Sequence, residues 1–428
     1  MRFASVNSIE IRNVNQATAI LNKRVVPALT ALSENTYLSA IRAGMVSIVP
    51  LTIIGGLFMI VSYFPSARWE KMVQPYLQLL QVPVTATFGL LAVFVCFAIG
   101  YDLGKRQKQE AIVSATIATV VFLMLQIRLK DLTLSMDGLG SKGLFTAIII
   151  ALVSVRVQTF FTDHGVVIKL PPNVPHIVYE SFLSLTPLFF LVLSFWVIRF
   201  VLGVDINNLV QATFKPMVFA LNTLPGILVY AFLVTMLWSV GINGDNAMDA
   251  LVAPIFLQYL TANVEATTAG LPLPYVTAYG FFTTFVNVGG TGATIALALI
   301  MWNSKEPGFR KVSRISLPTQ IFQINEPIFF GFPIVLNPIF MIPYILNALI
   351  LTAGTYLLMH WNVINKPFVN VPWTTPPIIG HYLVSGGDWK AAVWGVISIV
   401  IAMVVYFPFA KAAERQRLRA ETAGSAHE

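Results

Sequence analysis

Apolar stretches of about 20 residues recur along this sequence, and each is long enough to cross the hydrocarbon core of a bilayer as a helix. Of the 428 residues, 56% are hydrophobic and only 11% are charged, whereas an ordinary soluble domain carries about 25% charged residues. The sequence therefore predicts an all-α integral membrane protein with about ten transmembrane helices. The regular spans are expected at residues 43–64, 86–103, 111–126, 144–161, 181–203, 223–240, 340–359 and 389–409.

The pattern of hydrophobic residues changes about half-way along the chain. The early spans are regular, whereas residues 241–345 stay hydrophobic but are interrupted by Gly, Pro, Asn and Thr clusters. Broken backbone at membrane depth is tolerated only inside protein or beside a watery cavity, so we expect re-entrant hairpins there. Residues 66–83 and 206–221 predict interfacial amphipathic helices. We therefore expect an N-terminal transmembrane half, 1–205, and a C-terminal half with a cytoplasmic tail, 206–428.

Basic residues indicate the orientation of the chain. Lys and Arg number 27 against 19 Asp and Glu, a formal net charge of +8, which in a membrane protein points to cytoplasmic loops rather than to nucleic acid. Basic clusters follow the second span, precede residue 316 and close the chain, so both termini are expected in the cytoplasm. Residues 1–36 lack the early apolar region of a signal peptide and predict an amphipathic cytoplasmic helix or arm.

A single carboxylate, Glu326, lies in the most heavily interrupted stretch, residues 316–344. Each proline in this stretch removes a backbone donor and clashes with the preceding turn, which makes one smooth helix implausible. An ionisable group at membrane depth indicates a functional site. We therefore expect Glu326, with Asn325 beside it, in a polar site built from interrupted helices; the alternative is a helix cap in a surface loop. The prolines are Pro318, Pro327, Pro333, Pro338 and Pro343.

Three further polar groups in the second half are candidates for completing this site. Glycine in the Gly-rich turn at 287–294 permits positive φ and close approach of the backbone to a ligand. Amides, one carboxylate and an aromatic face suit a neutral sugar, whereas an anion site would need Arg and an amine site more carboxylates. The residues beside Glu326 that we expect to bind substrate are Asn243, Asp245, Asn246, Asn287, Gly289, Gly290, Asn325, Trp373 and His381.

Each group also has an ordinary structural interpretation. Asn243 and Asp245 could cap a helix, the glycines could serve only close helix packing, and Trp373 could belong to an interfacial aromatic belt. His381 could be a loop residue without a ligand role. The five histidines are scattered and no phosphate-cradling loop is present, so we expect no metal and no cofactor.

The run from Phe322 to Pro338, Phe-Gln-Ile-Asn-Glu-Pro-Ile-Phe-Phe-Gly-Phe-Pro-Ile-Val-Leu-Asn-Pro, resembles the signature of a known family. It is similar to the sugar-transporting IIC component of the bacterial phosphoenolpyruvate-dependent phosphotransferase system, in the lactose, diacetylchitobiose and cellobiose branch. Other similar stretches occur in the family's order and span residues 40 to 410. They are residues 167–175, 238–244, 288–294 and 372–374.

The resemblance implies a homodimeric permease among the lipids of the bacterial inner membrane. Its first half would form the dimer interface, and its second half would bind the sugar and move to give alternating access. A β-linked disaccharide such as cellobiose or diacetylchitobiose would be phosphorylated on its 6-hydroxyl during transport. The phosphoryl donor would be a cysteine of a separate IIB protein, loaded through IIA, HPr and enzyme I, so this chain would be the membrane component of a sugar phosphotransferase.

By position, Glu326 matches the family glutamate beside the sugar, Trp373 a sugar-contacting tryptophan, and Asn287 the hairpin tip. Many members have His where this chain has Asn243. Asn can bond a hydroxyl but cannot exchange a proton near neutral pH, so we expect Asn243 to hold the sugar and Glu326 to do the acid–base work. The alternatives are an ion-coupled symporter, with Glu326 and Asp245 carrying a proton or sodium, and a membrane sensor.

Overall fold

The part of the chain that the computed structural model describes is almost entirely helical, which confirms the predicted fold class. Within it, the only β pairing is an isolated antiparallel bridge between Ile127 and Leu134. The expected amphipathic arm at residues 1–36 lies almost wholly outside the described residues, as does much of the polar passage near residue 175. The described residues are 35–64, 67–168, 171, 182–332 and 334–424.

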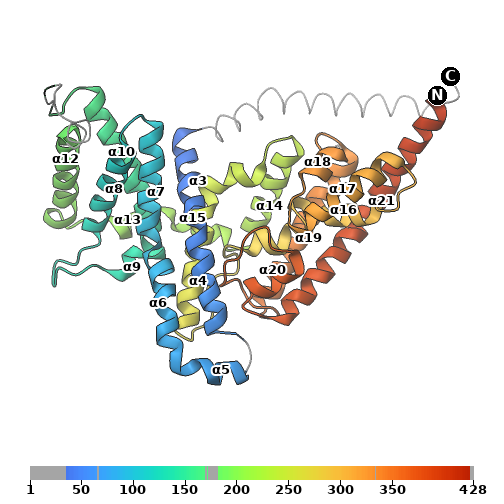
Figure 1. The fold of residues 1–428 in the computed structure, drawn as a ribbon, viewed down its shortest axis with the longest axis horizontal. Coiled ribbons are helices and arrows are strands. Elements are labelled where there is room, and N and C mark those ends of the chain that lie inside the picture. Colours follow the sequence, from blue (N-terminus) through green and yellow to red (C-terminus); the bar gives the residue numbers. More distant parts are fainter. Residues whose placement is uncertain (1–34, 65–66, 169–170, 172–181, 333, 425–428) are drawn as a thin grey trace.

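The first half forms an upright group of helices (Figure 1), in which α3 lies above α4, α7 lies above α6 beside them, and α5 lies across the lower end. Small residues let these helices approach closely: a Cβ on Gly104 of α7 would lie 2.6 Å from Ser114 Cβ of α8. The helices are α3 (Thr36–Ser47), α4 (Val49–Ser62), α5 (Ala67–Val73), α6 (Leu77–Thr87), α7 (Leu91–Arg106), α8 (Ala111–Leu125), α9 (Met136–Leu139), α10 (Leu144–Asp163) and α12 (Leu185–Trp196); α13 (Ile206–Leu221), the first helix of the expected second half, packs against α10.

The second half packs around α19 and α21, which contact each other and hold α14, α16 and α20. Helix α15 lies against α3 and so joins the two halves. A second join is made by Asn370, whose Nδ2 donates to Thr52 Oγ1 at 2.6 Å. The helices are α14 (Leu224–Ser239), α15 (Gly244–Thr268), α16 (Ile295–Met301), α17 (Pro307–Ile321), α18 (Glu326–Gly331), α19 (Pro338–His360), α20 (Pro377–Val384) and α21 (Trp389–Gly424).

Two segments differ from the expected pattern. Residues 244–268 lie in the region expected to be broken, yet they form the regular 25-residue helix α15 around Pro254, because neighbouring helices can satisfy the backbone group that a buried proline frees. In the segment expected to be interfacial, 66–83, only α5 lies across the bundle, and α6 continues upright toward α7 (Figure 1). The charges Arg68 and Lys71 are confined to α5, and α6 carries none.

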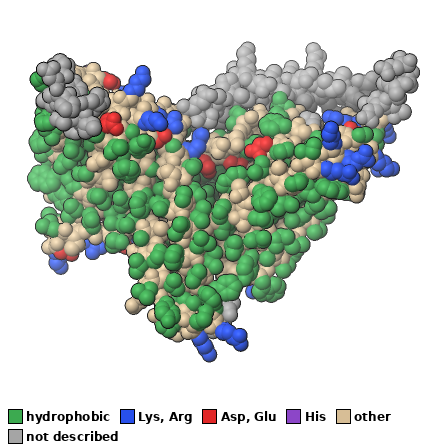
Figure 2. Space-filling view, in the orientation of Figure 1, with side chains coloured by type: hydrophobic (Ala, Val, Ile, Leu, Met, Phe, Trp, Pro, Cys, Tyr) green, Lys and Arg blue, Asp and Glu red, His purple; other side chains and the backbone are tan. Residues whose placement is uncertain are grey.

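Several helices meet the requirements for crossing a membrane. Among the described residues five stretches are long and apolar enough, and seven if each of two bent pairs is one span. The segment 206–221, expected to be interfacial, turns by 86° from the preceding helix. Figure 2 shows a broad hydrophobic band, with Lys and Arg side chains mainly near its upper and lower edges. The five stretches are Thr36–Ser62, Arg68–Arg106, Ser141–Asp163, Pro338–His360 and Trp389–Arg419; the count of about ten stays a prediction.

Candidate functional site

The Gly-rich turn at 287–294 connects a turn of π-helix, η6 (Phe281–Val286), to α16 through the short 3-10 turn η7 (Thr291–Ala293). The two apolar segments are bent by 46° at this break, as expected for a broken span or re-entrant loop. Gly290 has φ +102° and ψ +168°, a conformation essentially restricted to glycine. Tyr406 of α21 fastens the far side of the turn, since its hydroxyl donates to Gly292 O at 2.8 Å.

The residues just before Glu326 are hydrogen-bonded to this turn. Gln323 Oε1 accepts from the backbone N–H groups of Gly289 at 3.1 Å and Gly290 at 3.3 Å. Asn325 Nδ2 donates to the carbonyl oxygen of Thr291 at 3.0 Å. A Cβ on Gly290 would lie 2.4 Å from Asn325 Cβ. The glycines thus allow both the backbone conformation and the close packing, and the site segment is bonded directly to the turn.

Asp245 ties the start of α15 to the same turn. Its Oδ2 accepts from Trp238 Nε1 at 2.8 Å and from Thr291 Oγ1 at 2.7 Å. Its Oδ1 accepts from Asn287 Nδ2 at 3.3 Å. Hydrogen bonds to a charged acceptor are about twice as strong as neutral ones. Asp245 is therefore an organiser of the site, with both oxygens engaged by protein groups.

Asn243 and Asn246 lie at the N-terminus of α15. Asn243 is the N-cap residue, and its Oδ1 accepts from the backbone N–H of Asn246 at 2.9 Å. The helix-capping interpretation of Asn243 is therefore confirmed. The side chain of Asn246 is exposed. Asn243 still has an amide Nδ2 that can donate to a ligand, while one of the two acceptor positions of its Oδ1 is already used by the cap.

Glu326 is the first residue of α18, followed by Pro327. Its side chain is exposed, and the described residues supply no hydrogen bond or ion pair to its carboxylate. The N-cap position belongs to Asn325, so Glu326 does not cap the helix through its side chain. A negative charge in the first turn is favoured by the helix dipole. The result is an available carboxylate on a rigidly held segment.

Trp373 and His381 belong to a neighbouring loop and to α20. Trp373 is 55% exposed in a turn closed by the Thr375 N–H, which donates to Pro372 O at 2.9 Å. His381 is fully buried, with its ring centroid 4.5 Å from that of Phe285, and its Nδ1 bonds Pro377 O. His381 therefore packs behind η6 and supports the turn. None of the contacts of Trp373 or His381 joins them to Glu326.

Three residues of this network are additional to those expected from the sequence, and their only signal is their place in the family stretches. Trp238, Thr291 and Gln323 were not among the expected site residues, although each lies within a stretch quoted for the family resemblance. Gln323 also has a left-handed backbone, with φ +67°. That strain is uncommon for a side chain such as glutamine and tends to be found at functional sites. In the described residues no group of three or more His, Cys, Asp or Glu could hold a metal ion.

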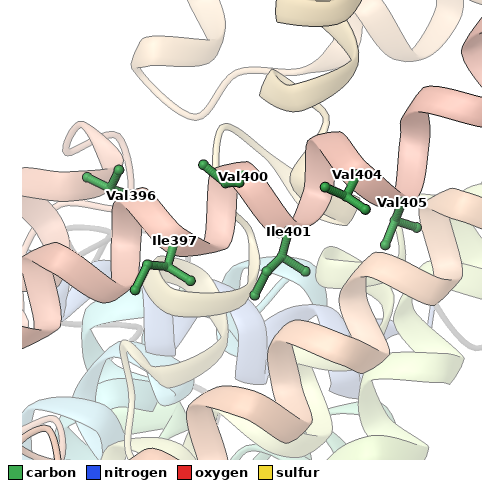
Figure 3. A pocket seen from close by; sticks show the side chains of 6 residues that line it. All are labelled: Val396, Ile397, Val400, Ile401, Val404 and Val405. Carbon is green, nitrogen blue, oxygen red and sulfur yellow. The ribbon is translucent and has the colours of Figure 1, made fainter.

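Two cavities elsewhere are less suited to a sugar. One, of about 300 Å³, is a groove along α21 (Figure 3) with no hydrogen-bonding side chain. The other, of about 380 Å³, lies between the first half and the start of α13. Of its cations, Lys142 and Arg199 are paired with Asp137 at 3.1 Å and Asp205 at 3.3 Å, and Arg128 donates to Ser135 Oγ at 3.2 Å. The residues lining the groove are Val396, Ile397, Val400, Ile401, Val404 and Val405.

Comparison with known proteins gives a consistent result. Residues 42–348 match the family model described as "Phosphotransferase system, EIIC". The chain is 32% identical to the lichenan permease IIC component of Bacillus subtilis (strain 168), over 95% of this chain and 96% of that protein. It is 33% identical to the cellobiose-specific EIIC component of Geobacillus stearothermophilus, over 94% and 96%.

A solved structure is also similar to this chain. It is the crystal structure of the transporter ChbC, the IIC component from the N,N'-diacetylchitobiose-specific phosphotransferase system. The TM-score is 0.88 with 32% sequence identity, and the match covers 94% of this chain and 99% of that one. The likeness therefore extends through both halves of the molecule.

Proposed function

This chain belongs to the phosphotransferase system EIIC family, and we propose on that basis that its cargo is a β-linked disaccharide of the cellobiose or diacetylchitobiose type. It is a sugar permease of the membrane that works with a IIB protein and the phosphotransferase cascade. Family membership does not favour the ion-coupled symporter. The names of the relatives, which refer to lichenan, cellobiose and diacetylchitobiose, support the choice of a β-linked sugar.

The observation that supports Glu326 as the catalytic residue is its position next to Gln323 and Asn325, which are hydrogen-bonded to the Gly-rich turn. Gln323 and Asn325 fix the backbone on one side of it through bonds to the Gly-rich turn. The carboxylate itself is exposed, and the described residues leave its oxygens available. A general base needs this combination, because it must reach the substrate proton while its own position is held.

In the proposed reaction the 6-hydroxyl of the sugar donates its hydrogen bond to the Glu326 carboxylate. The hydroxyl oxygen attacks the phosphorus of a phosphocysteine on IIB, its proton passes to Glu326, and the S–P bond breaks as the O–P bond forms. The cysteine leaves as a thiolate, and the sugar leaves as its 6-phosphate. The chain's contribution to this phosphoryl transfer is positioning and proton acceptance.

The remaining site residues act on binding in this proposal. Trp373 offers an exposed aromatic face to the C–H surface of the sugar. The amide of Asn243 and the exposed side chain of Asn246 donate to hydroxyls. Asp245 positions the Gly-rich turn, with Asn287, through the bonds described above. His381 supports η6 from behind.

We extend the proposal to topology. Both termini lie in the cytoplasm, residues 1–205 form the interface of a homodimer, and residues 206–428 hold the sugar. Placement of the basic ends supports this orientation, since the C-terminal ends of α7 and α21 lie toward the same edge of the molecule (Figure 1). Lys105, Arg106 and the Arg-rich end of α21 would then share the cytoplasmic face, as cytoplasmic loops prefer.

The test is transport and phosphorylation by the purified chain in proteoliposomes. Cellobiose, diacetylchitobiose, lactose and mannobiose are supplied with phosphoenolpyruvate, enzyme I, HPr, IIA and IIB. We expect one β-linked disaccharide to accumulate as its 6-phosphate, insensitive to an uncoupler. Uptake that persists undiminished without the cascade, giving unphosphorylated sugar, would refute the proposal and favour the symporter.

A further inference from the structure

Exposed basic side chains form one continuous surface at the end of the molecule where α21 finishes. They come from the loop between α16 and α17, from the first turns of α17, and from the end of α21. Figure 2 shows Lys and Arg side chains gathered at this end. This basic surface consists of Lys305, Arg310, Lys311, Arg314, Arg415, Arg417 and Arg419, all of them exposed.

Defined contacts hold the two parts of the basic surface together. Glu414 of α21 accepts from Ser304 Oγ and from the Lys305 N–H, each at 2.6 Å, and pairs with Lys411 Nζ at 2.8 Å. The guanidinium of Arg417 lies over the ring of Phe309, 4.8 Å from its centroid. The α16–α17 loop and the end of α21 are therefore fixed relative to each other.

The carboxylates of this region face inward. Glu306 and Glu414 are the only acidic residues in 302–325 and 410–419, and they are 3% and 5% exposed. Glu306 caps α17 by accepting from the Gly308 N–H at 3.0 Å and from that of Phe309. All the charge that these two segments expose to solvent is therefore positive.

The basic surface continues into the site along α17. After the cations, the exposed residues of this helix and of its C-cap are apolar: Ile315 is 60% exposed and Ile321 43%, and the C-cap residue Phe322 is 53% exposed. Glu326 lies two residues after Ile324 and directly before Pro327. Helix α17 has 15 residues and is therefore about 22 Å long. A protein interface of standard size, about 800 Å² per partner, is wide enough to cover a helix of this length.

We propose that this surface, the basic surface together with the apolar strip of α17, docks the phosphorylated IIB protein. The inference rests on the proposed function and names the place where the donor approaches. A phosphoryl group adds about two negative charges, and arginine is the preferred partner for phosphate. An apolar centre with a charged rim is typical of protein interfaces. An anionic lipid also matches the charge and the apolar strip, but it brings no phosphoryl donor to Glu326 at the end of that strip.

The test variant removes four of these charges without touching a side-chain bond that the structure shows: Arg310→Gln, Lys311→Gln, Arg415→Gln and Arg419→Gln. The matched control removes four exposed charges elsewhere: Arg68→Gln, Lys71→Gln, Lys105→Gln and Lys108→Gln. Both full-length proteins are placed in phosphatidylcholine membranes and, in parallel, in membranes that also contain phosphatidylglycerol. The probe is a phosphorylated IIB protein of a cellobiose-specific system, titrated against sugar phosphorylation in proteoliposomes and against equilibrium binding in nanodiscs.

We expect the half-saturating concentration of phosphorylated IIB to rise about tenfold in the test variant, the lower range of electrostatic steering. The control should stay within about twofold, disaccharide affinity should be unchanged in both, and added salt should shrink the difference. Equal IIB binding by the test variant and the unmodified chain would overturn the proposal. So would a defect that appears only with phosphatidylglycerol, which would assign the surface to lipid. Failure of the proposed function would look different, as the absence of phosphorylated sugar from the unmodified chain.

Discussion

Replacing Gly290 with alanine perturbs the close packing between the Gly-rich turn and Asn325. The new methyl carbon would lie 2.4 Å from Asn325 Cβ, where ordinary contact begins at 3.4 Å, so Asn325 must retreat by about 1 Å. Backbone strain at φ +102° costs about 1–3 kcal/mol, and overpacking adds about 1–3 kcal/mol. We expect the free energy of unfolding to fall by about 2–6 kcal/mol. A 1 Å shift beside Glu326 should slow phosphorylation about 100-fold.

Gly270→Ala is the matched control. Gly270 also has positive φ, +67°, but no atom lies within 4 Å of an added Cβ. The free energy of unfolding of this variant should fall only by the cost of placing alanine in the left-handed region, about 1–2 kcal/mol, and its turnover should be unchanged. Stability is measured by unfolding in detergent, and turnover by formation of sugar 6-phosphate.

A second variant separates the clash from general misfolding. Asn325→Gly in the Gly290→Ala background removes the clashing Cβ and should restore part of the lost stability, although the bond to Thr291 is lost. The coupling between the two positions follows from a double-mutant cycle. The reasoning is refuted if Gly290→Ala matches the Gly270→Ala control in both stability and turnover.

Three other substitutions test individual residues. Glu326→Gln should retain disaccharide binding, measured by calorimetry, while phosphorylation falls about 10²–10⁴-fold; unchanged turnover would remove Glu326 from the chemistry. Asp245→Asn replaces one of the two acceptor oxygens with an NH2 group, which opposes either the donors Trp238 and Thr291 or the donor Asn287, and should lower the free energy of unfolding by about 1.5–3 kcal/mol, read from thermal melting. Trp373→Ala should weaken disaccharide binding by about 1–3 kcal/mol; an unchanged Kd would place Trp373 away from the sugar.

The helices were predictable where hydrophobicity alone decides the structure. Apolar length identified α10 and α19 nearly to their ends, because a run of apolar residues near 20 long has one stable form in a bilayer. Helix α15 was not anticipated as regular. Its first residues, Gly244, Asp245 and Asn246, read as a break, whereas Asn243 in fact supplies the cap that starts the helix.

The candidate site was predictable only in its local parts. The carboxylate among prolines and the Gly-rich turn are readable from neighbouring residues. The bonds that join them are not: Gln323 reaches back 34 residues to Gly289, and Thr291 reaches 46 residues to Asp245. Such pairings depend on how the helices pack, and a single sequence carries no local signal for them. The resemblance supplied Glu326 and Trp373 as candidates without giving these contacts.

Helix α21 makes two hydrogen bonds that hold neighbouring segments in place. Tyr406 holds the Gly-rich turn through Gly292, and eight residues later, about 12 Å along the axis, Glu414 holds Lys305. Local opening in proteins proceeds by contiguous cooperative units. An opening of this part of α21 therefore releases two contacts together, the bond accepted by the Gly292 carbonyl and the bond donated by the Lys305 N–H, and we expect the Lys305 amide proton to exchange with solvent only through that opening.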